Sequence, residues 1–210
     1  FRPLATPHWP GNLKRYKIVN FKDRDPEIQD ATGVKATNDA TGFFRSDAKS
    51  FWSSSADGND VTAGGAAEKL PGYSSRKMYT YYSGSPSTTL TNAANALSTA
   101  NIANISKARL GSTAESDTYH RNLIDWTRGQ DIGAADGDGV TTEDRKRLSD
   151  PLHSIPLLLT YGGTDEAPDI TIFYGDNEGF LHAIDADDGT EVFSFIPEAL
   201  LPNLRVLRDN

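Results

Sequence analysis

The last quarter of the chain alternates between short apolar runs and turn residues. Four runs, each rich in aromatic and branched aliphatic side chains, occupy residues 155–161, 170–174, 180–184 and 191–196. Segments rich in Gly, Asp and Asn separate them, and Pro197 ends the last one. Short runs bounded by residues that accept positive φ are typical of strands joined by tight hairpins. The pattern predicts one four-stranded antiparallel sheet over residues 155–196, the unit from which β-propellers are built.

The first 149 residues show weaker patterns, which predict a loop-rich region with short strands. Stretches at 13–19 and 76–82 predict strands, and the polar stretch 21–42 predicts a short hairpin with loops. An aromatic cluster follows, made up of Phe43, Phe44, Phe51 and Trp52. Such rings contribute large buried areas, so we predict that they pack in a local core, with ligand stacking as the alternative.

Helical patterns are few. Residues 115–128 predict a helix that docks one side through Leu123, Ile124 and their neighbours and ends at Gly129. Residues 89–109 are rich in Asn and Thr, which are poor in helix interiors, and predict a loosely helical or irregular insertion. Residues 198–207 predict a helix that Pro202 interrupts. The fold class is therefore mainly β with short helical insertions.

Composition narrows the functional classes. The chain has 210 residues, 37% of them hydrophobic, a net charge of −8 and no cysteine. The acidity argues against nucleic acid or an anionic membrane as the main partner; it fits a soluble surface, with attraction for divalent cations as the alternative. The lack of cysteine excludes disulfides, thiol catalysis and covalent c-type haem within this sequence. No apolar run reaches the length of a membrane span.

Five segments, in order, resemble one family of bacterial surface proteins. They read W.GNLK.Y from Trp9, SFWS…DG..V..GGAA..L…R..YTY from Ser50 to Tyr81, W.RGQD from Trp126, DPLHS.P from Asp150, and G.N.G.LHA.DA..G.E.F..IP from Gly175. The last segment is similar to the blade signature of quinoprotein-like propellers. Taken together, the five segments resemble the PilY/PilC-type adhesins of type IV pilus tips.

This resemblance implies a non-enzymatic propeller scaffold at the pilus tip, on the bacterial cell surface. It implies adhesion to surfaces or host-cell receptors, support of pilus assembly, and minor pilins as partners. Residues 21–42 and 84–117 are the loop-rich candidates for display. Two alternatives stay open: a quinoprotein-type (PQQ) dehydrogenase domain, and a structural envelope propeller without adhesion.

The resemblance also suggests how the chain is divided. Residues 1–149 are expected to form the first part of a propeller domain, 150–197 a blade, and 198–210 a connecting segment. No second blade is visible, although propeller blades bury both faces against neighbours. We therefore expect a fragment of a longer propeller, whose remaining blades, or another copy of the chain, cover the exposed face.

One loop carries the pattern of a calcium site. Between residues 131 and 144, the oxygen donors that Ca²⁺ prefers are supplied by Asp136, Asp138, the carbonyl of Val140, Glu143 and Asp144. The full EF-hand pattern fails, since its twelfth position is Arg147. An acidic turn, with Asp and Gly present for backbone reasons, is the alternative. The family resemblance implies calcium dependence without pointing to this loop.

No motif of catalysis is found. The four histidines, His8, His120, His153 and His182, lie far apart in the sequence, and we expect them to form structural hydrogen bonds. The resemblance places His153 and His182 near each other in the blade. No GxSxG, HExxH or Ser/His/Asp signature is present, and paired carboxylates occur only in turns.

Overall fold

The computed structural model describes residues 9–23, 25–133 and 138–210. Its strands are β1 (Pro10–Gly11), β2 (Lys17–Val19), β3 (Glu27–Gln29), β4 (Met78–Tyr81), β5 (Leu148–Ser149), β6 (Leu157–Gly163), β7 (Pro168–Gly175), β8 (Leu181–Asp185) and β9 (Glu191–Pro197). Its helices are α1 (Gly65–Glu68), α2 (Asp117–Arg128) and α3 (Asn203–Asp209), with 3₁₀ turns η1 (Phe21–Asp23), η2 (Ala93–Asn95), η3 (Thr99–Asn101) and η4 (Glu198–Leu200). The chain is mainly β with few helices, as the sequence predicts.

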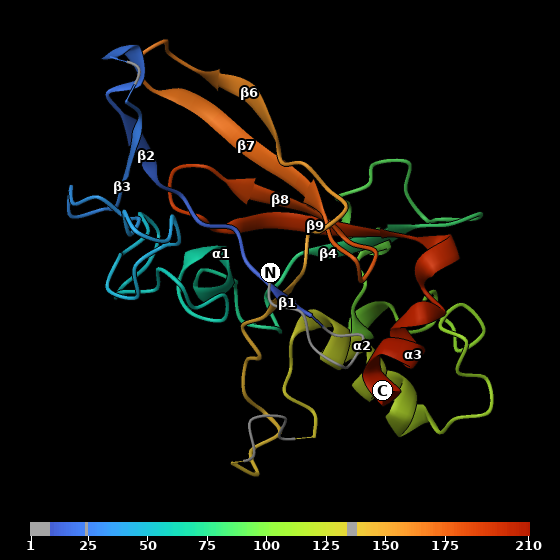
Figure 1. The fold of residues 1–210 in the computed structure, drawn as a ribbon. Helices are drawn as coiled ribbons and strands as arrows, with labels where there is room; N and C mark the ends of the chain where they lie inside the picture. The colour runs from blue at the N-terminus through green and yellow to red at the C-terminus, as the bar shows by residue number, and fades with distance from the viewer. Residues whose placement is uncertain (1–8, 24, 134–137) are drawn as a thin grey trace.

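A five-stranded mixed sheet in the order β4-β9-β8-β7-β6 organises the molecule (Figure 1). Strands β6 to β9 are the four consecutive antiparallel strands that the sequence predicts. The prediction of a four-stranded antiparallel sheet is incomplete, because β4 pairs parallel to β9, with Tyr79 opposite Phe195. The pairing joins residues on either side of position 150, and local patterns carry no information on such distant partners.

Most weaker patterns also have their counterpart in the structure. Strand β2 lies in the predicted strand at 13–19 and pairs with β3, Ile18 opposite Ile28, so the hairpin begins before the predicted stretch 21–42. Helix α2 begins after Ser116, whose hydroxyl accepts a hydrogen bond from the Tyr119 amide. Gly129 ends α2 in the left-handed conformation, with φ of 109°. The Asn-rich insertion holds only η2 and η3, and Pro202 lies between η4 and α3, as predicted.

One face of the sheet is covered by the chain itself, and Figure 1 shows the helices gathered below the sheet. Two buried clusters fill this side. The first packs α2, α3 and the end of β9 together and includes Met78, Leu97, Ile105, Leu110, Leu123, Ile124, Ile196, Leu201 and Leu204. The second packs α1 against β7 and β8 and includes Trp52, Ala66, Ala67, Leu70, Leu148, Ile172, Tyr174 and Ile184.

The opposite face carries aromatic rings that contact one another across the sheet. Tyr161 meets Phe173 edge-on with ring centroids 6.4 Å apart, Phe173 meets Phe193 at 6.3 Å, and Phe193 meets Tyr79 at 6.4 Å. The small Ala183, which pairs with both Phe173 and Phe193, lets these rings meet over β8. We call this row the aromatic ladder. Its outer end is open to solvent, since Tyr161 and the whole of β6 are exposed.

Position 189, in the turn between β8 and β9, requires glycine for two reasons, its backbone conformation and the close packing around it. Its φ is +81°, and a Cβ at this position would lie 2.6 Å from the Trp52 ring. The variant Gly189→Ala is expected to lower the free energy of unfolding by about 2 kcal/mol, because backbone strain and overpacking add. Urea unfolding followed by circular dichroism measures this loss.

Gly33 is the matched control, since it has φ of +80° and no atom within 4 Å of the place that a Cβ would take. The variant Gly33→Ala is expected to lose only the backbone part, about 1 kcal/mol. Equal losses in the two variants would show that the Trp52 contact contributes nothing.

Candidate functional site

A row of four buried, ionisable side chains crosses the covered face of the sheet. Arg76 donates from Nε to Glu191 Oε2 at 2.6 Å and from Nη2 to Oε1 at 2.9 Å. His182 Nδ1 lies 2.8 Å from Glu191 Oε1, and His182 Nε2 lies 3.0 Å from Asp176 Oδ2. Arg76, Glu191 and His182 are 6%, 4% and 1% exposed. We call these four residues the buried charge network.

The strands β7, β8 and β9 and the turn between β7 and β8 position three residues of the buried charge network. His182 lies on β8 and stacks on Tyr174 of β7, with ring centroids 4.9 Å apart. Asp176 begins the β7–β8 turn, where its Oδ1 accepts a hydrogen bond from the Phe180 amide at 2.8 Å. Glu191 begins β9, and a β-bulge at Val192 sets it opposite Ile184, because Val192 is an extra residue between the pairs Phe193–Ala183 and Glu191–Ile184. A bulge re-aims the side chains of its own strand, and here it turns a carboxylate toward His182.

The network is charged at neutral pH. Burial lowers the pKa of His182, but its hydrogen bonds to Asp176 and Glu191 outweigh burial and raise the pKa to about 9. Burial opposes ionisation of Glu191, yet Arg76 and His182 hold the pKa of its carboxyl far below the usual range. With both ring nitrogens of His182 donating to carboxylates, neither is available to accept a proton. These ion pairs therefore link β8, β9, the β7–β8 turn and the segment before β4 to one another.

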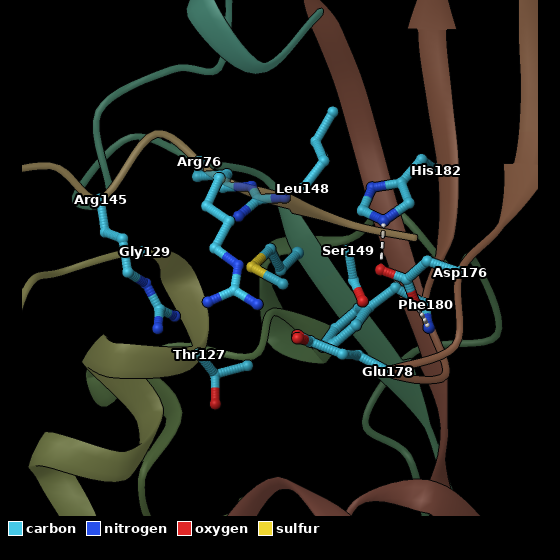
Figure 2. A pocket seen from close by; sticks show the side chains of 12 residues that line it. Arg76, Thr127, Gly129, Arg145, Leu148, Ser149, Asp176, Glu178, Phe180 and His182 are labelled. Carbon is cyan, nitrogen blue, oxygen red and sulfur yellow. Dashed lines mark hydrogen bonds and ion pairs between the residues drawn. The ribbon is translucent and has the colours of Figure 1, made fainter. Parts of the chain in front are cut away.

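A small polar cavity adjoins the network, and its lining residues converge on it in Figure 2. Its volume is about 30 Å³, which accommodates roughly one water molecule and is far below the size of a small-molecule site. Arg145 and Ser149 line it. Arg145 stacks over Trp126 at 4.2 Å, and burial lowers the pKa of its guanidinium to about 10. This cavity has no room for an organic substrate.

Hydrogen bonds also join the DPLHS segment to the β7–β8 turn. Asp150 accepts from Asn177 twice, at its carbonyl from the amide N–H at 3.0 Å and at Oδ1 from Nδ2 at 2.6 Å. His153 Nδ1 lies 2.9 Å from Asn177 Oδ1, and Ser154 Oγ accepts from the Gly175 amide at 2.9 Å. His153 and His182 thus form hydrogen bonds to adjacent residues of this turn, Asn177 and Asp176.

The remaining two histidines, and the carboxylates that bind His182, can also be compared with the sequence predictions. His120 Nε2 lies 2.7 Å from the Ile105 carbonyl, a structural hydrogen bond as predicted, and His8 lies outside the described residues. Sequence reasoning missed Asp176 and Glu191 as partners of His182. The signal was weak, since Asp176 also reads as a turn residue and Glu191 as the exposed start of a strand.

The residues of the predicted calcium loop are only partly described. Asp136 lies outside the described residues. Asp138 Oδ1 accepts from the Val140 amide at 2.7 Å, and the Glu143 carbonyl accepts from the Asp131 amide at 2.9 Å. Asp144 Oδ1 accepts from the Tyr73 amide at 2.6 Å. In the part of the chain that the structure describes, no three His, Asp or Glu side chains gather into a metal-binding group.

Comparison with known proteins gives one short relationship. The type IV pilus biogenesis factor PilY1 homolog of Xylella fastidiosa (strain Temecula1 / ATCC 700964) is 48% identical over 33 residues, which is 16% of this chain and 3% of that protein. No family model matches the chain, and no solved structure matches it. Within the described residues, no helix is both long and apolar enough to cross a membrane. The similarity to a PilY1 homolog therefore covers a short segment of each protein.

Proposed function

We propose that this chain is a non-catalytic piece of a propeller scaffold in a type IV pilus biogenesis protein, working in attachment at the cell surface. The observation that carries the proposal is the 33-residue similarity to a pilus biogenesis factor of the PilY1 type. The order of the family-like segments along the sequence supports it, because separate motifs in one order rarely coincide by chance. Minor pilins and a surface or host receptor are the proposed partners.

The two unequal faces of the sheet support the propeller part of the proposal. One face is packed by two buried clusters, whereas the aromatic ladder and the exposed strand β6 lie on or beside the other. Leu157 and Leu159 of β6, which lie on the same face as Phe173, are 57% and 39% exposed. A propeller blade buries such surfaces against its neighbours. We propose that further blades of a longer polypeptide cover this face.

The buried charge network suits this role, since it fixes the hairpins without offering a reactive group. A rigid scaffold can display variable loops, and binding residues concentrate on loops held by rigid elements. Calcium in the 131–144 loop remains part of the proposal, with Asp136, Asp138, Val140, Glu143 and Asp144 as its ligands.

Deletion of the gene that encodes this chain tests the proposal, in two strains that differ in whether their pili retract. With retraction active, we expect fewer surface pili, because assembly loses its support. With retraction blocked, we expect normal numbers of pili but reduced attachment. The intact gene, returned to the deletion strain, is the control. Attachment that stays normal at equal piliation contradicts adhesion, and unchanged pili in both strains contradict the pilus role.

A further inference from the structure

A second hollow lies on the surface away from the buried charge network. Its volume is about 560 Å³, within the range of small-molecule sites. The residues that line it are Asn12, Lys14, Tyr16, Phe43, Phe44, Gly58, Asn59 and Val61. They come from three segments: residues 12–16, which lead into β2, residues 43–44, and residues 58–61. We call it the aromatic hollow.

Aromatic rings form one wall of this hollow, which corrects the prediction of a local aromatic core. Tyr16 and Phe44 meet with ring centroids 4.5 Å apart and planes tilted by 32°. Phe43 is 77% exposed, and of the predicted cluster only Trp52 is buried. The core prediction failed because the turn at 40–43 carries Phe43 out to solvent. Exposed rings beside a hollow favour the alternative that the sequence left open, ligand stacking.

Hydrogen-bonding groups stand beside these rings. The Tyr16 hydroxyl is buried away from solvent, so this residue offers a ligand its ring and not its oxygen. The exposed amide of Asn59 offers two donors and an acceptor at the turn. An exposed amide can exchange its bound water for the hydroxyl groups of a ligand.

The hollow has little free charge, and its base is fixed before any ligand arrives. Lys14 Nζ donates to the carbonyls of Asp57 and Asp60 and lies 3.2 Å from Asp57 Oδ2, so its charge is compensated. Asn12 donates from Nδ2 to the Gly64 carbonyl at 2.9 Å and accepts at Oδ1 from the Ala67 amide at 3.1 Å. These bonds hold the side chains in place, which reduces the entropy cost of binding.

We propose that the aromatic hollow binds a neutral saccharide. A sugar ring has an apolar C–H face that lies against aromatic rings such as Phe43 and Phe44, and hydroxyl groups at its edge that pair with the Asn59 amide. A purely aliphatic ligand makes no use of this amide, and an anionic ligand finds Lys14 already neutralised. The inference rests on the proposed attachment role and adds the chemical class of the ligand.

Saturation-transfer NMR with the 210-residue chain tests this assignment. The probes are glucose, galactose, mannose, N-acetylglucosamine and their common disaccharides, with sialic acid and arginine as charged comparisons. We expect transfer to the ring C–H protons of at least one neutral sugar. The variant Phe43→Ala is expected to weaken that binding about tenfold, because a stacked ring at the rim is lost.

The matched control is Phe51→Ala. Phe51 is 42% exposed but lies outside the hollow, beneath Arg15 at 5.8 Å. Its variant is expected to bind the sugar as the original chain does. Transfer to no neutral sugar, binding of sialic acid or arginine alone, or equal affinity of the Phe43→Ala variant would each overturn the inference. Attachment can still depend on the gene if the sugar assay fails, so the two proposals are tested separately.

Discussion

Replacing Glu191 by alanine is expected to lower the free energy of unfolding by about 3–5 kcal/mol, because it leaves two buried cations without their shared partner. Glu191 binds Arg76 through both carboxylate oxygens and also accepts from His182. Removing one member of a buried ion network strands the others in a medium where water cannot solvate them. Urea unfolding followed by far-ultraviolet circular dichroism measures the loss.

Two variants serve as controls for this prediction. Val192, the next residue on β9, is 42% exposed, and Val192→Ala is expected to change the stability by about 0.5 kcal/mol or less. The double variant Arg76→Met with Glu191→Leu is expected to recover much of the lost stability, since apolar replacement of a whole buried pair is often nearly neutral. A loss below about 1 kcal/mol in Glu191→Ala is the size expected of an ordinary substitution. It would contradict a stabilising role of the buried charge network.

The stability of the chain is also expected to fall on the alkaline side, through His182. Its pKa rises from 6.5 in the unfolded chain to about 9 in the folded one. Its contribution is complete below pH 6.5, declines as the pH rises, and is lost above about 9. The shift corresponds to about 3 kcal/mol at most. Glu191 acts oppositely: its pKa is lowered from 4.5, so its contribution is present above pH 4.5 and is lost as the pH falls.

The network therefore stabilises the fold most between pH 4.5 and 6.5, where both contributions are complete. Urea unfolding at half-unit steps from pH 4 to 10 measures the profile. In the variant His182→Gln, which cannot titrate, we expect lower stability at pH 6 and a shallower decline toward pH 9. Equal stability of the original chain at pH 6.5 and 9 would contradict the raised pKa of His182.

The strands of the last quarter could be predicted because their signals are local. Each apolar run is bounded by turn residues, and the Asp176–Gly179 and Asp187–Gly189 turns supply the positive φ that hairpins need. Strand β4 was predicted as a strand, but its parallel partner was not. Pairing between residues so far apart depends on the packing of the whole chain.

The buried charge network shows why the candidate site was harder to foresee. Side chains of a regular strand alternate between the two faces of the sheet. Since Ile196 and Ser194 of β9 are buried on the covered face, regular alternation would put Val192 on that face and Glu191 on the other. The bulge at Val192, where β9 has one residue more than β8, reverses this, so that Glu191 is buried and Val192 exposed. A one-residue change of register moves every side chain beyond it to the other face. A sequence pattern does not reveal such a bulge without its partner strand.

The place of β9 between β4 and β8 has a consequence for how the chain is made. During synthesis, β4 leaves the ribosome long before residues 191–197. Until those residues appear, the backbone N–H and C=O groups of β4 that pair with β9 have no partner strand. Contacts between distant segments form slowly, and unpaired strand edges promote aggregation in the meantime. Strand β9 is the last strand of this sheet to be translated, and its arrival completes the sheet. A ribosome-stalled chain ending before residue 191 should therefore need a chaperone to stay soluble.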